Sequence, residues 1–190
     1  METNENQIAL AVATGEPERF TELYDLYADR IYRFAYYRSR HRETAEDLTS
    51  QTFIKALEKI SSFNPEKGNF GVWIYRIARN TVYDHFRSDK ATSELNEDLA
   101  APSTVERDTE NKILLDKVET YLGKLDPKHR ELVILRVWDG LTFSEIAQIT
   151  GKSEAASKMA YSRIMARLNQ EVPALVLLAG LAATINLKTL

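Results

Sequence analysis

Apolar side chains recur at every third or fourth position along most of this chain, and that spacing restricts the chain to helices. One continuous helical face consists of Phe20, Leu23, Tyr24, Tyr27, Ile31, Phe34 and Ala35. Glycine and proline are scarce, with 7 and 5 residues, and they fall between such stretches. The sequence contains no convincing strand pattern and no internal repeat, so we expect an all-α fold.

The composition is that of a folded protein without metal or disulfide chemistry. The 190 residues, 44% apolar and 28% charged, suffice for one medium domain or two small ones. Cysteine is absent, and the three histidines, His41, His85 and His129, lie far apart, so we expect no metal site and no cofactor. The first seven residues are polar and acidic, unlike a signal peptide, and we expect a cytoplasmic protein.

A change of character near the middle divides the chain in two. The segment from Ala91 to Arg107 is small, polar and acidic, and it contains Pro102. Residues 91–125 carry eight acidic and four basic side chains, so the negative excess of a chain with net charge −3 lies here. We therefore expect two small helical domains joined by a flexible acidic linker. The expected boundaries are 1–90, 91–108 for the linker, 109–171, and 172–190 for an apolar extension.

The helix expected from Asn69 to Arg87 carries two different faces. One is suited to a protein core and consists of Ile74, Ile77, Ala78 and Thr81. The other mixes aromatic rings, guanidinium groups and an amide, in Trp73, Arg76, Asn80, Tyr83, Asp84 and Arg87. Such a mixture binds unstacked bases, because aromatic rings stack on base faces and arginines contact phosphates. An ordinary amphipathic helix with half-buried aromatic residues fits the same pattern.

The C-terminal part predicts a helix-turn-helix. Asp126 and Pro127 begin a helix that buries Leu132, Val133, Leu135 and Val137 or Trp138 and ends at Gly140. Thr142 and Glu145 form a capping box, Gly151 suits a tight turn, and Ser153 caps the last helix. Its inward positions are Ser157, Tyr161, Ile164 and Leu168. Its outward positions are Ala155, Ala156, Lys158, Met159, Ser162 and Arg163, and they suit a DNA major groove. A helical hairpin without DNA contact is the alternative.

Three segments together resemble the extracytoplasmic-function sigma factors, the smallest members of the sigma-70 family. They are AEDLTSQTFIKAL from Ala45, FGVWIYRIARNTVYDHFR from Phe70 and DPKHRELVILRVWDGLTFSEIAQITG from Asp126. The resemblance covers roughly residues 18–168. It implies a sigma region 2 bundle at the N-terminal end and a region 4 helix-turn-helix at the other. It also implies promoter-specific initiation with RNA polymerase core, whose β′ clamp helices and β flap are the expected partners.

The resemblance carries residue roles for region 2. The helix expected from Thr44 to Ile60 would dock on the clamp helices through Asp47, Leu48, Gln51 and Lys55. The loop Ser61 to Asn69, with Asn80 beneath it, would form a pocket for an extruded base of the −10 element. The residues expected at the −10 DNA are Asn64, Lys67, Asn69, Trp73, Arg76, Arg79, Asn80, Tyr83 and Arg87. The three arginines are assigned to phosphates, and Trp73 either stacks on a base or wedges the loop against the helix.

Region 4 departs from the family pattern. The residues expected at the −35 DNA are Ser153, Ala155, Ala156, Lys158, Met159, Ser162, Arg163 and Arg167. The arginine that such factors usually carry is replaced by Ala160. Since a bidentate arginine contact to guanine gives about 1–3 kcal/mol of discrimination, we expect weak or unusual −35 reading.

The resemblance also implies control by an anti-sigma factor. The apolar run from Ala174 to Ile185 is too short to span a bilayer, and we expect it to fold back on a domain or to dock a regulator.

A stand-alone helix-turn-helix regulator with an N-terminal sensing domain is the main alternative function for the whole chain. An all-α enzyme is the other, although no nucleophile–base pair or glycine-rich phosphate loop supports it. We expect no catalytic residues and no small-molecule substrate.

Overall fold

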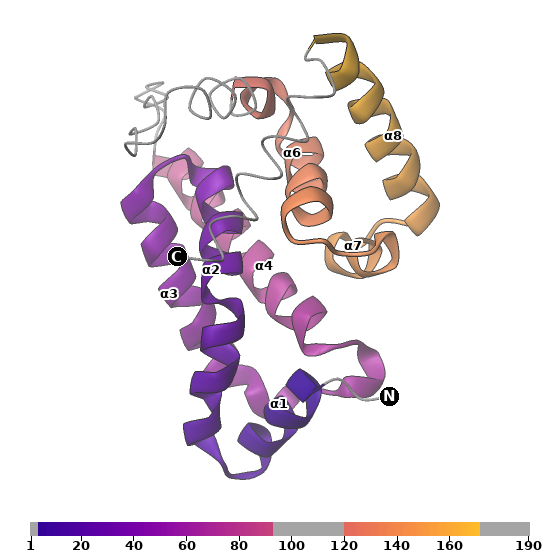
Figure 1. Ribbon diagram of the computed structural model, residues 1–190. Helices are drawn as coiled ribbons and strands as arrows, with labels where there is room; N and C mark the ends of the chain where they lie inside the picture. The colour runs from indigo at the N-terminus through magenta and orange to yellow at the C-terminus, as the bar shows by residue number, and fades with distance from the viewer. Residues whose placement is uncertain (1–3, 93–119, 172–190) are drawn as a thin grey trace, which may run out of the picture. The chain divides into compact units, whose positions relative to one another are not determined.

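The computed structural model describes residues 4–92 and 120–171. These residues form helices and turns without a strand, which confirms the all-α prediction (Figure 1). The chain divides into two compact units, residues 1–103 and 104–190, and each is described by itself. Within the described residues, no helix combines the length and apolarity that a membrane crossing requires.

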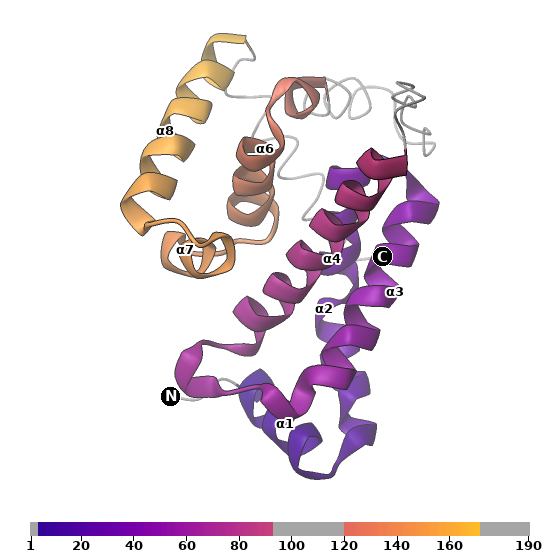
Figure 2. The ribbon, with the colours of Figure 1, turned by 180° about the vertical axis from the view of Figure 1, so that it is seen from behind.

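The first unit is a bundle of four helices, α1 (Asn4–Thr14), α2 (Phe20–Ser39), α3 (Arg42–Lys59) and α4 (Phe70–Thr92). Helices α2 and α3 form an antiparallel hairpin, and α4 packs along both of them (Figures 1 and 2). Their core is apolar and tightly closed. It includes Leu23, Ile31, Phe34, Ala45, Leu48, Ala56, Ile74, Tyr75 and Ala78, none of them more than 1% exposed.

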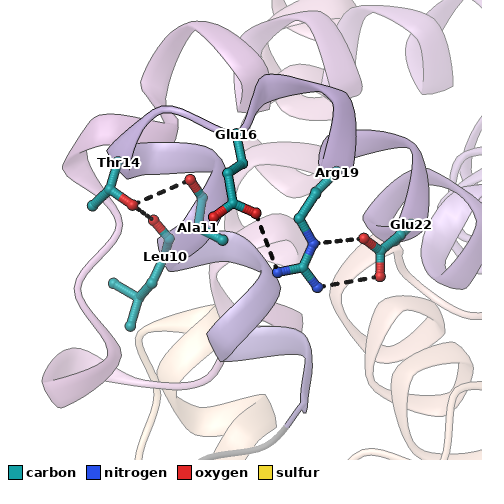
Figure 3. A network of polar contacts seen from close by, with 6 residues as sticks. All are labelled: Leu10, Ala11, Thr14, Glu16, Arg19 and Glu22. Atoms are coloured by element: carbon teal, nitrogen blue, oxygen red, sulfur yellow. Dashed lines mark hydrogen bonds and ion pairs between the residues drawn. The ribbon is translucent and has the colours of Figure 1, made fainter.

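Helix α1 is absent from the sequence prediction, because its apolar stripe is short and precedes the long pattern. It buries Ile8, Ala9 and Val12 against the rest of the unit. Figure 3 shows how the chain turns from α1 into α2. The Thr14 hydroxyl donates to the carbonyl of Leu10 at 2.9 Å and closes the last turn of α1. Arg19 then pairs with Glu22 at 2.7 Å, and its hydrogen bond lowers the pKa of that carboxyl group.

The α2–α3 corner lies in a stretch rich in basic residues, Arg38 to Arg42. Arg40 takes a left-handed conformation, with φ 57°, and its N–H donates to Tyr36 at 2.7 Å. His41 caps α3 by accepting from the N–H of Thr44 at 3.3 Å, so the helix starts at Arg42, two residues before the predicted start.

The second unit contains residues 120–124 in helical conformation, α6 (Pro127–Val133), α7 (Phe143–Thr150) and α8 (Glu154–Glu171). The predicted caps are confirmed. Asp126 accepts from the N–H groups of Lys128 and His129, at 3.0 and 3.1 Å. Thr142 and Glu145 form the capping box, and Gly151 has φ 72°. The helix that begins at Pro127 ends close to the predicted Gly140, but its last part, Ile134–Trp138, is a π-helical turn, which was not predicted.

The core of the second unit follows the predicted periodicity. Its buried apolar residues include Leu132, Val133, Leu135, Ile146, Ile149, Ile164 and Leu168. Val137 and Trp138, one of which was expected to be buried, are both half-buried and lie in the π turn. The apolar extension 172–190 and all but the first two residues of the predicted linker 91–108 lie outside the described residues.

Candidate polymerase and promoter interfaces

A hollow of about 280 Å³ lies between the loop after α3 and the first half of α4. It is lined by Ser62, Asn64, Lys67, Gly68, Asn69, Val72, Trp73, Arg76, Ile77 and Asn80. Six of the residues predicted at the −10 DNA are therefore brought together, and the predicted pocket over Asn80 is present. Ser62 and Gly68 belong to the loop that was expected to form the pocket, whereas sequence reasoning missed Val72 and Ile77 as lining residues. Ile77 was assigned to the core and is half-buried at its edge.

The loop holds its shape through local hydrogen bonds. The side-chain oxygen of Asn64 accepts from the N–H of Glu66 at 2.9 Å, next to Pro65. The side-chain oxygen of Asn69 accepts from the N–H of Val72 at 2.8 Å and caps α4. Two N–H groups, one in the loop and one at the start of α4, thus have adjacent side-chain partners, which helps to order this wall.

The pocket combines positive charge, amide groups and one aromatic ring. Lys67 and Arg76 supply the charge and are exposed, as is Asn80. Trp73 is half-buried, with its ring centroid 5.7 Å from that of Phe63 and 5.5 Å from that of Phe70. Such a site can accept a flat heterocycle beside a phosphate.

The three other predicted −10 residues lie further along α4. The Arg79 guanidinium stacks on the ring of Tyr83, 4.5 Å from its centroid, and Arg38 of α2 lies 4.8 Å from the same centroid. The ring of Tyr83 therefore contacts two guanidinium groups, and the side chain is half-buried. Arg87 is exposed and pairs with Asp84 at 3.0 Å. These residues form a basic continuation of α4 rather than part of the pocket.

The predicted polymerase face on α3 is partly different from expectation. Asp47 and Gln51 are exposed, as predicted. The prediction that Leu48 makes a surface contact is wrong, because the side chain is 1% exposed and packs in the core. Lys55 is half-buried, and its Nζ donates to the hydroxyl of Thr81 on α4 at 3.2 Å, so it links two helices. Sequence reasoning missed Ile54, which is 58% exposed.

The N-terminal part of α8 presents the surface predicted to read the −35 element. The predicted inward residues Ser157, Ile164 and Leu168 are buried, and Tyr161 is half-buried. All eight predicted −35 residues are exposed, and they are Ser153, Ala155, Ala156, Lys158, Met159, Ser162, Arg163 and Arg167. Ser153 also caps the helix, since its hydroxyl accepts from the N–H of Ala156 at 3.1 Å.

A second hollow, of about 530 Å³, lies beside this surface. Its lining residues are Arg136, Phe143, Lys158, Tyr161, Ser162, Met165 and Ala166. The Arg136 guanidinium lies 4.7 Å from the Phe143 ring centroid and donates to the carbonyl of Leu141 at 2.8 Å. Burial raises the pKa of Tyr161, against the opposing charge of Arg136. The hollow extends the basic face of α8 toward α7.

Comparison with known proteins identifies both units. The family model of Sigma-70 region 2 matches residues 23–92, and that of Sigma-70 region 4 matches residues 115–168. The ECF RNA polymerase sigma factor BldN of Streptomyces coelicolor is 39% identical over 168 residues, which cover 84% of this chain. The chain spans 62% of the length of BldN.

Two further relatives agree with these matches. RNA polymerase sigma factor YlaC of Bacillus subtilis is 30% identical over 138 residues, covering 70% of this chain and 79% of YlaC. A solved structure of the sigma factor RpoE with the anti-sigma factor NepR, from Bartonella quintana, has a TM-score of 0.64 at 25% identity. It covers 81% of this chain and 98% of RpoE. The chain belongs to the sigma-70 family and is an RNA polymerase sigma factor of the extracytoplasmic-function type.

Proposed function

We propose that this sigma factor binds RNA polymerase core and directs promoter-specific initiation by capturing one base of the −10 element in the α3–α4 pocket. The pocket of about 280 Å³ carries this proposal, because it places Trp73, Arg76 and Asn80 around a space large enough for a base. Opening a duplex costs stacking and pairing energy, and a pocket that holds an extruded base offsets part of that cost. Asn80 can both donate to and accept from a base edge.

The core-binding surface that we propose lies on α3 and has an apolar centre. Ile54 is 58% exposed, while Gln51 and Asp47 are exposed polar neighbours one and two turns away, respectively. An apolar side chain surrounded by polar ones is the usual arrangement of an energetically important interface contact. The β′ clamp helices are the proposed partner, and the β flap is proposed to bind the second unit.

The second unit is proposed to bind the −35 element through α8. Lys158, Arg163 and Arg167 contribute phosphate contacts, and Ala155, Ala156 and Met159 present a small, largely apolar surface to the groove. Ala160 is half-buried, and its methyl group cannot make the contact to a base that the usual arginine would make. Shape and phosphate contacts are proposed to carry most of the affinity.

We propose further that an anti-sigma factor controls this chain, and that the chain acts in the cytoplasm as an initiation factor without a reaction of its own. The relative RpoE was solved with the anti-sigma factor NepR, which supports this kind of partner. The domain limits 1–90 and 109–171, with a linker between them, are proposed as the units that such a partner would hold apart from DNA.

Run-off transcription with core polymerase and fragmented genomic DNA tests the proposal. We expect discrete transcripts with the chain present and none with core alone. A matched pair tests the core surface, because Ile54→Asp is expected to lose core binding, whereas Leu26→Asp, at an exposed leucine of α2, keeps it. Absence of specific initiation, also after truncation at Glu171 and without inhibitor, would sink the proposal.

A further inference from the structure

No residue of helix α1 has been given a functional role so far. It ends at Thr14, before the region 2 match begins at residue 23. It nevertheless packs against α2 and α4 within the first unit (Figure 1). Two consecutive polar residues, Glu5 and Asn6, point from it into the bundle, where an apolar helix face would be expected to contribute hydrocarbon side chains.

Asn6 supplies a hydrogen bond to the start of α4. Its side chain is 7% exposed, and its oxygen accepts from the N–H of Phe70 at 2.8 Å. The first amide groups of a helix have no carbonyl partner within that helix, and a buried one needs a partner from elsewhere. The side-chain oxygen of Asn69 accepts from the N–H of Val72. That of Asn6, 64 residues before Phe70 in the sequence, accepts from the N–H of Phe70.

Glu5 acts on the next residue of α4 through a tyrosine. Its carboxylate accepts from the hydroxyl of Tyr27 at 2.9 Å, and Tyr27 is 2% exposed. A Cβ at Gly71 would lie 2.8 Å from that hydroxyl oxygen, so the backbone of α4 approaches Tyr27 as closely as glycine permits. Consecutive residues of α1 therefore fix consecutive residues at the start of α4.

The fixed residues lie inside the wall of the pocket. Asn69 and Val72, on either side of Phe70 and Gly71, both line it. The Phe70 ring lies 5.5 Å from Trp73 and 5.8 Å from Phe63, measured between ring centroids, and so joins α1 to the aromatic part of the wall. A shift at Phe70 would move Asn69 and Trp73 relative to Asn80, two to three turns further along α4.

We propose that α1 positions the base pocket, with Asn6 as the positioning residue that sets the start of α4 and Glu5 supporting it through Tyr27. Neither side chain touches DNA in this role. The proposal rests on the proposed function of the pocket. It assigns to α1 control over which base is held and how tightly, separate from the affinity for core polymerase, which belongs to α3.

The test uses the full chain assembled with core polymerase. Binding is measured to single-stranded oligonucleotides of the non-template strand, taken from a promoter found by run-off transcription, with each −10 base varied in turn. Asn6→Ala is expected to weaken this binding about tenfold, as the loss of one buried hydrogen bond would, and to flatten the preference at one position. Core affinity is expected to stay within about twofold, since α3 is untouched.

Two further variants make the result specific. Asn6→Asp keeps an oxygen acceptor, and negative charge is favoured at a helix N-terminus, so we expect binding and base preference near wild type. Gln7→Ala, at the exposed neighbouring position of α1, is the matched control and is expected to behave as wild type. If circular dichroism shows that Asn6→Ala is unfolded, the same measurements are made on Tyr27→Phe, which removes only the hydroxyl that Glu5 binds. The result for Tyr27→Phe then tests the proposal.

The outcomes separate this inference from the proposed function. Unchanged strand binding and base preference in folded Asn6→Ala would overturn the inference alone. A parallel loss of core affinity, or no rescue by Asn6→Asp, would overturn it as well, because either result indicates general destabilisation. If wild-type holoenzyme itself does not bind the strand, the proposed function fails, and the wild-type measurement alone reveals that.

Discussion

Trp73 packs edge-on against Phe63, with their ring centroids 5.7 Å apart and their planes at 67°. This contact joins the first turn of α4 to the loop that follows α3, and the same tryptophan lines the pocket between them. The two roles considered for Trp73 are therefore compatible, because the ring is half-buried and can hold the loop with one part while another part borders the hollow.

We predict that Trp73→Phe and Trp73→Ala behave differently. Phenylalanine retains an aromatic ring against Phe63, so stability and run-off activity should remain near wild type. Alanine removes the contact and leaves a partial cavity, which should lower the free energy of unfolding by about 2–4 kcal/mol and abolish specific initiation. Urea unfolding and run-off transcription measure the two effects. Equal loss of initiation in both variants, with Trp73→Phe stable, would instead assign the indole to base stacking.

Asn80→Ala should separate binding from stability at the same pocket. The side chain is exposed on α4 and lines the hollow, so its removal should leave the unfolding free energy unchanged within about 0.5 kcal/mol. A lost hydrogen bond to a base edge should cost about 1–3 kcal/mol in binding to the single-stranded −10 strand. Fluorescence anisotropy with holoenzyme measures this. Ser88→Ala, exposed two turns further along α4, is the control.

Periodicity and caps predicted a large part of the fold and of this site, because both are local. The capping box of Thr142 and Glu145 and the left-handed Gly151 need only residues close in sequence. The pocket over Asn80 was predicted because its loop and helix are adjacent in the chain, and because the family resemblance indicated which loop to consider. The outward face of α8 followed from its helical spacing alone.

The prediction errors arose where contacts between segments far apart in the sequence determine the burial or the partner of a side chain. Nothing near Asn6 in the sequence indicates that its partner is Phe70, 64 residues away. Leu48 was assigned to a surface from a family pattern, whereas the packing of α3 against its neighbours buries it. The π turn at Ile134–Trp138 has no distinctive sequence signal, so the half-burial of Val137 and Trp138 was not predictable from spacing.

The close approach of Gly71 to Tyr27 gives a double-mutant prediction. Gly71→Ala should destabilise the first unit by about 1–3 kcal/mol, because its Cβ would lie 2.8 Å from the Tyr27 hydroxyl oxygen. Tyr27→Phe removes that atom, and the next contacts, at 3.4 and 3.5 Å, are ordinary. Alanine at position 71 should therefore cost less in the Tyr27→Phe background. Additive effects in urea unfolding would mean that the two residues do not meet as described.

The helix cap at Asp126 predicts acid sensitivity of the second unit. Partial burial by itself raises the pKa of Asp126, but hydrogen bonds from the His129 and Lys128 N–H groups and the charge of His129 outweigh it and lower the pKa. A carboxyl group with a lowered folded pKa stabilises the fold above its unfolded value, near 3.8, and loses that effect as the pH falls through the folded pKa.

Asp126→Ala should accordingly lower stability by about 1 kcal/mol at pH 7 and by less below pH 3. The chain has two tryptophans, so a Trp73→Phe background leaves Trp138 as the reporter of the second unit. Urea unfolding followed by its fluorescence at several pH values measures the difference. A difference that stays constant from pH 7 to pH 2.5 would contradict the cap as its source.

Replacing Lys158 distinguishes two roles that this residue of α8 could have, contact with a DNA phosphate and recognition of a base. The side chain is exposed in the second turn of the helix and borders the hollow that contains Arg136. A phosphate contact contributes equally to all sequences and releases counterions, so Lys158→Ala should weaken binding to every −35 variant by a similar factor. The slope of log affinity against log salt should fall by about one. Lys124→Ala, at an exposed lysine outside α8, should leave both quantities unchanged. If Lys158→Ala changes the preference among −35 sequences and leaves the salt slope as it is, Lys158 reads a base.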